Sequence, residues 1–143
     1  MIEGVEPTFL DTNILVYASV DTSPFHTAAY NIISTLEAQN TQLWISRQVM
    51  REYLATLIRP TIAIPTSDLI NIVRAFELRY QIAEESPLVT AQLLTFLDQG
   101  ISRHVHDTNI VATMLTYGIR RIITNNPKDF APFSSLIMIV PLI

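Results

Sequence analysis

Four acidic side chains occupy positions from which they could act together on a substrate. Asp11 directly follows one apolar run, and Glu52 directly precedes another. Asp107 lies at the start of a late helical pattern, and Asp129 follows the apolar run at residues 121–124. Burying a carboxylate beside apolar sequence is unfavourable unless the group is paired or bound to a metal ion. The placement of these acids therefore suggests a shared site.

Converging carboxylates repel one another and would take up protons, and a divalent cation removes that penalty. The chain has no cysteine, so the available ligands are oxygen atoms, and these favour Mg²⁺ or Mn²⁺. Such an ion would let an acidic pocket accept a phosphodiester, activate water and stabilise the leaving oxygen. Taken singly, each acid has a simpler explanation as a turn residue, a helix cap or a solvated helix residue. Metal binding therefore requires that these acids lie close together in the folded chain.

The elements that position these acids alternate along the chain. Short apolar runs predict strands at residues 8–10, 42–45, 80–83, 121–124 and 136–140. Helical spacing covers residues 25–36, 49–57, 69–76, 87–97 and about 107–115, and residues 11–13 form a turn into a further helix. This alternation predicts a three-layer α/β/α fold around a central parallel sheet of about five strands.

Ligands of open parallel sheets bind beyond the carboxyl ends of the strands. Asp11, Ser46 and Thr124 come at or directly after the ends of three predicted strands. We therefore expect these three side chains to face the same edge of the sheet. Ser46 is also a candidate N-cap of the helix that carries Glu52.

Length and composition favour one folded domain over residues 1–143, with 49% apolar and 15% charged residues. The mean hydropathy of +0.31 excludes a disordered chain. The absence of cysteine excludes disulfides, a thiol nucleophile and a cysteine-based zinc site. Because the net charge is −4, the protein does not wrap nucleic acid with a basic surface, but an acidic metal centre remains compatible with it.

The N-terminal residues 1–7 have no basic segment followed by a long apolar one, which argues against a signal peptide. No apolar run approaches the roughly 20 residues that span a bilayer. We therefore expect a soluble, cytoplasmic protein that does not associate with membranes.

Four motifs in a fixed order resemble the PIN domain family. They are Phe-Leu-Asp-Thr-Asn-Ile-Leu-Val-Tyr-Ala at residues 9–18, Ser46 followed by Glu52, Asp-Thr-Asn-Ile-Val-Ala at residues 107–112, and Thr-Asn-Asn-Pro-Lys-Asp-Phe at residues 124–130. The resemblance spans nearly the whole chain. Its small size is similar to that of the VapC-type toxins of toxin–antitoxin pairs.

The resemblance implies a metal-dependent endoribonuclease that uses Mg²⁺ or Mn²⁺, with metal-binding acids at the positions of Asp11, Glu52 and Asp107. The fourth acidic position of the family falls on Asn126, which brings no charge, and Asp129 matches a further acidic position. We therefore expect Asp129 to be a weaker fourth catalytic acid.

The polar positions of the family site fall on Ser46 and Thr124, and together with Asn126 these would orient water, phosphate or the acids. The family also implies an RNA substrate, a cognate antitoxin and a homodimer. Arg47 and Arg51 lie near the start of the helix that carries Glu52, and arginine suits bidentate phosphate contact. We expect these two arginines to contact RNA or the antitoxin.

Three alternatives remain open from the sequence. An aspartyl-phosphate phosphatase or receiver would also place an aspartate after its first strand, although the phosphatase pattern has a second aspartate where this chain has Asn13. His104 and His106 could join Asp107 in a zinc site, although closed structural zinc sites usually need four nitrogen or sulfur ligands. The third alternative is a non-catalytic PIN-like interaction module.

Overall fold

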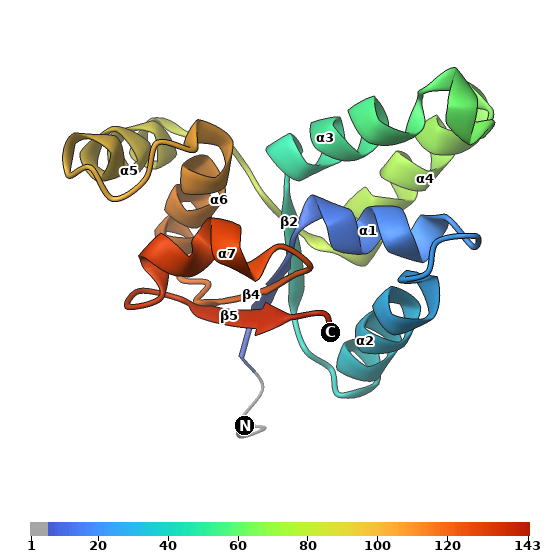
Figure 1. Cartoon of the computed structure of the whole chain (residues 1–143), viewed down its shortest axis with the longest axis horizontal. Helices are drawn as coiled ribbons and strands as arrows, with labels where there is room; N and C mark the ends of the chain where they lie inside the picture. Colours follow the sequence, from blue (N-terminus) through green and yellow to red (C-terminus); the bar gives the residue numbers. More distant parts are fainter. Residues whose placement is uncertain (1–5) are drawn as a thin grey trace.

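A five-stranded parallel sheet forms the centre of the computed structural model, which describes residues 6–143 (Figure 1). The strands are ordered β3-β2-β1-β4-β5 across the sheet, and every neighbouring pair is parallel. Their bounds are β1 Thr8–Leu10, β2 Leu43–Ser46, β3 Gln81–Ala83, β4 Arg121–Thr124 and β5 Met138–Pro141. The prediction of no signal peptide rests mainly on residues 1–5, which lie outside the described part.

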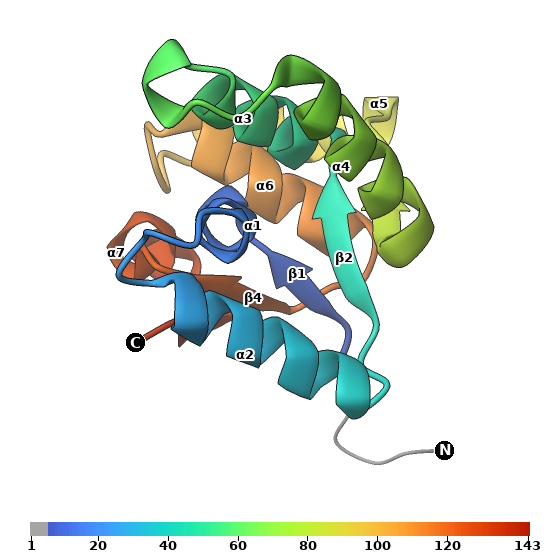
Figure 2. The same ribbon diagram turned by 90° about the vertical axis from the view of Figure 1, so that its right-hand side faces the viewer.

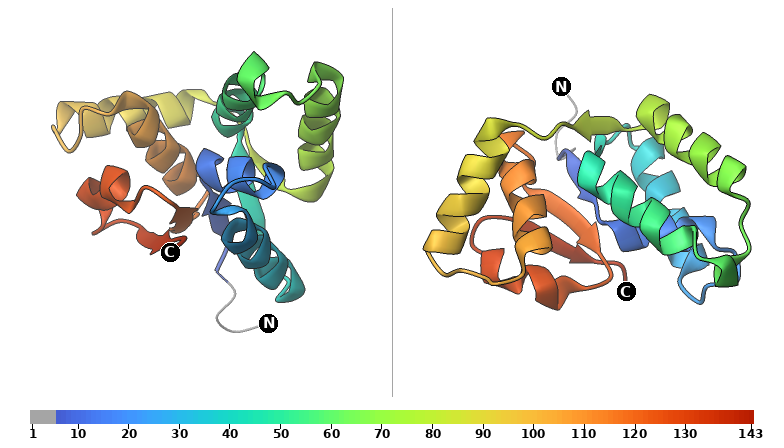
Figure 3. Two further views of the ribbon diagram at one scale, coloured as in Figure 1. Left: turned by 45° about the vertical axis from the view of Figure 1, so that its right-hand side comes forward. Right: turned by 90° about the horizontal axis from the view of Figure 1, so that it is seen from above.

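Seven α-helices and two short 3₁₀ helices surround the sheet within the described residues. They are α1 Thr12–Ser19, α2 His26–Ala38, α3 Arg47–Leu57, η1 Pro60–Ile62, α4 Thr66–Arg79, α5 Pro87–Asp98, α6 Val105–Thr116, α7 Pro127–Phe130 and η2 Ala131–Phe133. Helices α1 to α4 lie on one side of the central strands, and α5 to α7 lie on the other (Figures 1 and 3). The predicted α/β fold with a parallel sheet of five strands is confirmed.

The order in which the chain forms the strands explains why α1 to α4 and α5 to α7 lie on different sides. From β1 it proceeds outward to β2 and β3, and it then returns past β1 to form β4 and β5 on the other side. Because crossovers between parallel strands are right-handed, a reversal of direction moves the helices to the opposite face. In this sheet the direction of the strand order reverses at β1, and Asp11 directly follows this strand.

Central strands that are covered on both faces carry apolar side chains in succession. Phe9 and Leu10 of β1 are fully buried, as are Ile45 of β2 and Ile122 of β4. These strands bond in register, with Phe9 opposite Trp44 on one side and opposite Ile122 on the other. The sheet therefore provides a rigid base for the residues that follow β1 and β4.

Two helix starts differ from the sequence prediction. Helix α6 begins at Val105, so Asp107 lies within its first turn rather than capping it. Helix α4 begins at Thr66, before the predicted range 69–76, and its N-cap Pro65 makes no side-chain cap because proline has no polar side-chain atom.

The last strand also lies later than predicted. Residues 136 and 137 extend the apolar run, but their amides both donate to the carbonyl of Phe133 at the end of η2. Ile137 is buried as part of the core rather than paired in the sheet, and β5 begins at Met138. Within residues 6–143, no helix combines the length and apolar character that crossing a membrane requires.

Candidate active site

A cavity of about 320 Å³ lies at the carboxyl end of β1, and four carboxylates line it. The acids are Asp11, Glu52, Asp107 and Asp129, and the rest of the lining is Thr12, Asn13, Val16, Tyr17, Thr56 and Asn126. Figure 2 shows β1 and β2 pointing toward the end of the molecule where α1, α3 and α6 lie. The structure thus brings together all four acids that the sequence singled out, and we call this cavity the acidic pocket.

Asp11 is held at the junction of β1 and α1 by several hydrogen bonds. Its Oδ1 caps α1 by accepting from the amide of Thr12 at 2.8 Å. Its Oδ2 accepts from Thr124 Oγ1 at 2.8 Å and from Asn13 Nδ2 at 3.2 Å. Thr124 ends the neighbouring strand β4, and its own Oγ1 accepts from the amide of Asn126 at 2.9 Å. Thr124 therefore fixes the carboxylate of Asp11 and does not line the cavity.

The pKa values of two acids are displaced upward in the acidic pocket. Burial raises the pKa of Asp11 from 3.8 to about 6, against the hydrogen bonds of Thr124 and Thr12, and the charges of Asp107 and Glu52 add to the rise. The pKa of Asp107 is also raised, first by burial and then by the charge of Asp129. Both pKa values are therefore raised mainly by burial, and the neighbouring acids add to the rise.

Glu52 and Asp107 reach the pocket from helices on opposite sides of the sheet. Glu52 lies in the middle of α3, and Gln48 Nε2 donates to its Oε1 at 2.8 Å from one turn earlier. Asp107 lies in the first turn of α6, where the partial positive charge of a helix N-terminus favours an acid.

Asn126 and Asp129 come from the segment that follows β4. Asn126 precedes Pro127, which opens the four-residue helix α7, and Asp129 lies in that helix. Asn126 is exposed and Asp129 is half-buried. The sequence prediction had no helix here, because four residues are too few to show helical periodicity.

The lining suits a hydrated ion better than a closed cage of protein ligands. Among the described residues, no group of three or more acids, histidines or cysteines is placed to hold a metal ion. Mg²⁺ usually keeps several water molecules and takes only one or two carboxylates. Thr12 lines the pocket, and its Oγ1 is the one buried side-chain nitrogen or oxygen in the described chain without a hydrogen-bond partner.

The other polar residues expected at the site lie outside the acidic pocket. Ser46 is 2% exposed, and its Oγ caps α3 by accepting from the amide of Val49 at 3.2 Å. Arg51 pairs with Glu85 at 2.7 Å and lines a neighbouring cavity of about 390 Å³. That cavity shares Glu52 with the acidic pocket.

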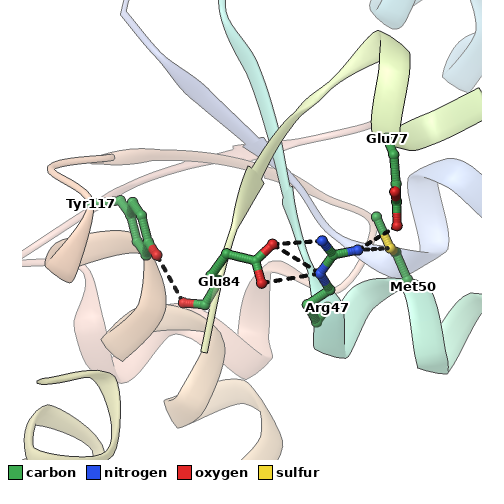
Figure 4. A network of polar contacts seen from close by, with 5 residues as sticks. All are labelled: Arg47, Met50, Glu77, Glu84 and Tyr117. Atoms are coloured by element: carbon green, nitrogen blue, oxygen red, sulfur yellow. Dashed lines mark hydrogen bonds and ion pairs between the residues drawn. The ribbon is translucent and has the colours of Figure 1, made fainter. Parts of the chain in front are cut away.

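Arg47 lies in a network of charged groups that connects three elements (Figure 4). Its guanidinium donates to Glu84, which follows β3, at 2.6 Å, and it pairs with Glu77 of α4. Tyr117 donates to the carbonyl of Glu84 from the end of α6. The sequence-based assignment of Arg47 and Arg51 to RNA or antitoxin contact stays a prediction, and in this structure both are paired with glutamates.

Two residues that the sequence reasoning did not single out belong to the site. Thr12 carries the unpaired hydroxyl, and Gln48 contacts Glu52. A signal for Thr12 was present, because it lies inside the motif at residues 9–18. Gln48 had none, since a glutamine in an amphipathic helix is usually a solvated residue.

A larger cavity, of about 460 Å³, lies at the opposite, amino-terminal edge of the strands. Among the described residues that line it, Glu6 is the only acid, and Arg120 and Arg121 are the basic ones. It therefore lacks the cluster of acids that distinguishes the acidic pocket.

The sequence model of the PIN domain family matches residues 7–127 of the chain. Among proteins with curated functions, none matches the sequence.

Several solved structures are similar in fold. VapBC2 from Rickettsia felis, bound to a DNA fragment from its promoter, has a TM-score of 0.67 at 23% identity, with 92% of this chain and 96% of that chain covered. A toxin–antitoxin complex from Klebsiella pneumoniae has a TM-score of 0.66 at 22% identity, with 95% and 98% covered. VapC20 from Mycobacterium tuberculosis, described as a toxin that cleaves the sarcin–ricin loop, has a TM-score of 0.64 at 16% identity, with 80% and 86% covered.

Proposed function

Because this chain belongs to the PIN domain family, we propose that it is an endoribonuclease that depends on Mg²⁺ or Mn²⁺ and acts as the toxin of a toxin–antitoxin pair. The observation that carries the proposal is the acidic pocket, in which four acids from separate parts of the chain line one cavity. The description of VapC20 as a toxin that cleaves the sarcin–ricin loop supports RNA as the substrate.

Asp11, Glu52 and Asp107 would hold the ion, directly or through water, and Asp129 would add a fourth carboxylate. A bound divalent ion would supply Lewis-acid chemistry, which activates water and stabilises the leaving oxygen of the phosphodiester. A bound ion would also favour the ionised form of Asp11 and Asp107, whose pKa values are raised first by burial and then by the neighbouring acids.

The chain's own groups orient the reacting atoms. Thr124 and the amide of Thr12 hold the two oxygens of Asp11, so this carboxylate keeps one direction. Thr12 lines the pocket and its Oγ1 has no hydrogen-bond partner, so a rotation of this side chain toward the cavity would let it donate to a phosphate oxygen. The N-terminal turns of α1 and α6 both lie at the pocket, and their partial positive charge favours a bound phosphate.

The aspartyl-phosphate alternative is weakened by Asn13, which stands where the phosphatase pattern has a second aspartate and donates to Asp11 Oδ2 at 3.2 Å. The zinc alternative is weakened because His106 lies within α6 and residues two apart on a helix do not face each other.

The partners follow from the same reasoning. The similar structures from Rickettsia felis and Klebsiella pneumoniae are toxin–antitoxin complexes, which supports a cognate antitoxin for this chain. A homodimer and a cytoplasmic location are part of the proposal, and sedimentation of the purified protein would test the first.

Incubation of the purified chain with total RNA tests the activity. We expect cleavage with Mg²⁺ or Mn²⁺, none with EDTA, and none for Asp11→Asn. Asp98→Asn is a matched control, because the same change is made at an exposed acid at the end of α5, away from the acidic pocket. Cleavage by Asp11→Asn at the rate of the unchanged protein would refute the metal assignment.

A further inference from the structure

The side chain of Gln48 bridges the two helices that carry Glu52 and Asp107. It lies on α3, and only 5% of the residue is exposed. Its Nε2 donates to Glu52 Oε1 at 2.8 Å and to the backbone carbonyl of His106 at 3.0 Å. Its Oε1 accepts from Asn109 Nδ2 at 2.8 Å. Both donors and the acceptor of this buried amide are therefore used.

The neighbours of Gln48 allow only one orientation of its amide. An ionised carboxylate and a backbone carbonyl can only accept, so both must face Nε2. A flipped amide would set its oxygen against the Glu52 carboxylate and the His106 carbonyl, and both contacts would be repulsive. The contacts of Gln48 therefore form a specific three-way bridge rather than a general polar contact.

We infer that Gln48 is a positioning residue of the acidic pocket, which holds Glu52 in place relative to Asp107 so that both can serve one divalent ion. His106 directly precedes Asp107, so the bond to its carbonyl also fixes the start of α6. The inference rests on the proposed function, since it assigns a further residue to the same site.

Two physical effects make such a bridge necessary. The acids of the pocket repel one another, which would drive Glu52 and Asp107 apart in the absence of an ion. Glutamate also has several rotatable bonds, and fixing them on ion binding would lower the affinity. A buried amide that holds Oε1 in advance removes part of that loss, and loss of such an outer contact typically lowers metal affinity or activity about 10–100-fold.

The test compares Gln48→Met with Tyr53→Phe. Methionine keeps the length of the side chain but removes all three hydrogen bonds. Tyr53→Phe removes one hydrogen bond of the same helix, from Tyr53 Oη to Ser19 Oγ at 2.8 Å, which connects α3 to α1 and does not involve the acids. Both variants should lower the melting temperature in EDTA, so stability alone does not separate a positioning role from a structural one.

Mn²⁺ affinity, measured by calorimetry without RNA, does separate them. We expect Gln48→Met to bind Mn²⁺ about 10–100-fold more weakly and Tyr53→Phe to bind it as the unchanged protein does. Unchanged affinity in Gln48→Met, with normal binding by the unchanged protein, would overturn this inference alone. Failure of the unchanged protein to bind Mn²⁺ would overturn the proposed function as well.

A second variant covers the case in which Gln48→Met does not fold. Asn109→Ala removes the group that donates to Gln48 Oε1 and leaves the other two bonds of Gln48 in place. We expect a smaller but measurable loss of Mn²⁺ affinity, because the amide is then less firmly held. Full affinity in Asn109→Ala would count against the positioning role.

Discussion

Asp11 combines deep burial with two charged neighbours, and this combination makes the stability of the protein depend on pH. The pKa of Asp11 is raised to about 6 in the folded chain, from 3.8 as its ordinary value. Between these two values the folded state binds a proton that the unfolded state has released. The free energy of unfolding therefore falls as the pH rises from about 4 to about 6, and the loss is complete above 6.

Asp11→Asn should remove this dependence. At about 1.4 kcal/mol for each pH unit, the displacement of the pKa corresponds to on the order of 3 kcal/mol. We expect the variant to gain stability relative to the unchanged protein between pH 4 and pH 7 in EDTA, by up to that amount. Urea unfolding at several pH values measures the difference. If the difference in the free energy of unfolding between the two proteins stays constant over this range, the pKa of Asp11 is not raised in the folded state.

Asn126 is the position at which this chain departs from the acids of the family. Asparagine can donate and accept hydrogen bonds but brings no charge to a bound cation. Because Asn126 lines the acidic pocket, Asn126→Asp should tighten divalent-ion binding and lower the Mn²⁺ concentration needed for half-maximal cleavage. If that concentration is unchanged or higher in Asn126→Asp, Asp129 or water already completes the site.

Asp129 also lines the pocket, from the short helix α7 rather than from the end of a strand. Its side chain therefore depends on a four-residue segment for its position, whereas Asp11 is held by three hydrogen bonds. We expect Asp129→Asn to reduce cleavage less than Asp11→Asn does, as measured by initial rates at saturating Mn²⁺. Equal losses of cleavage in the two variants would mean that Asp129 contributes as much to catalysis as Asp11 does.

The start of α3 allows a test at the scale of one element. Ser46 caps α3 and Ser86 caps α5 with the same geometry, each accepting from the amide three residues later at 3.2 and 3.3 Å. Replacing either by alanine should lower the free energy of unfolding by about 1 kcal/mol. Because Ser46 does not line the acidic pocket, we expect cleavage well below the melting temperature to be similar in both variants. A loss of cleavage in Ser46→Ala alone would support the sequence-based assignment of Ser46 to the site.

Strands with adjacent apolar residues could be predicted from the sequence, and very short helices could not. The runs that became β1 and β4 contain the buried apolar pairs Phe9-Leu10 and Ile122-Ile123. Helix α7 has only four residues, so no periodicity could reveal it. The later start of β5 was also missed, because Ile137 packs in the core without belonging to the strand. Its apolar side chain therefore did not reveal where the strand begins.

Asp11 could be predicted because it directly follows a strand, and Asp107 because it lies near the start of a helix. Glu52, in the middle of α3, was identified by the apolar residues after it and by the family motif. Gln48 could not be predicted, because its role depends on contacts with His106 and Asn109, which lie about sixty residues away in the chain. No pattern among neighbouring residues reveals a contact between positions so far apart in the chain.

A divalent ion should stabilise the whole molecule, because the pocket exists only in the folded chain. When the concentration of free ion is about a hundred times the dissociation constant, binding adds about 2.7 kcal/mol to the free energy of unfolding. This corresponds to a rise of roughly 5–10 °C in melting temperature. We expect this rise with Mn²⁺ or Mg²⁺, its reversal by EDTA, and a smaller rise for Asp11→Asn. A rise with Zn²⁺ alone, lost when His104 and His106 are replaced, would favour the zinc alternative instead.

The position of β4 beside β1 also bears on when the protein can act during its own synthesis. Thr124 holds Asp11 across a separation of 113 residues, and Asp107 and Asp129 likewise belong to the later part of the chain. A growing chain emerges from the ribosome N-terminus first, so Asp11 and Glu52 are exposed long before their partners. The acidic pocket can form only after β4 and α7 have left the exit tunnel. The proposed nuclease site is therefore incomplete on any nascent chain from which residues 121–130 have not yet emerged.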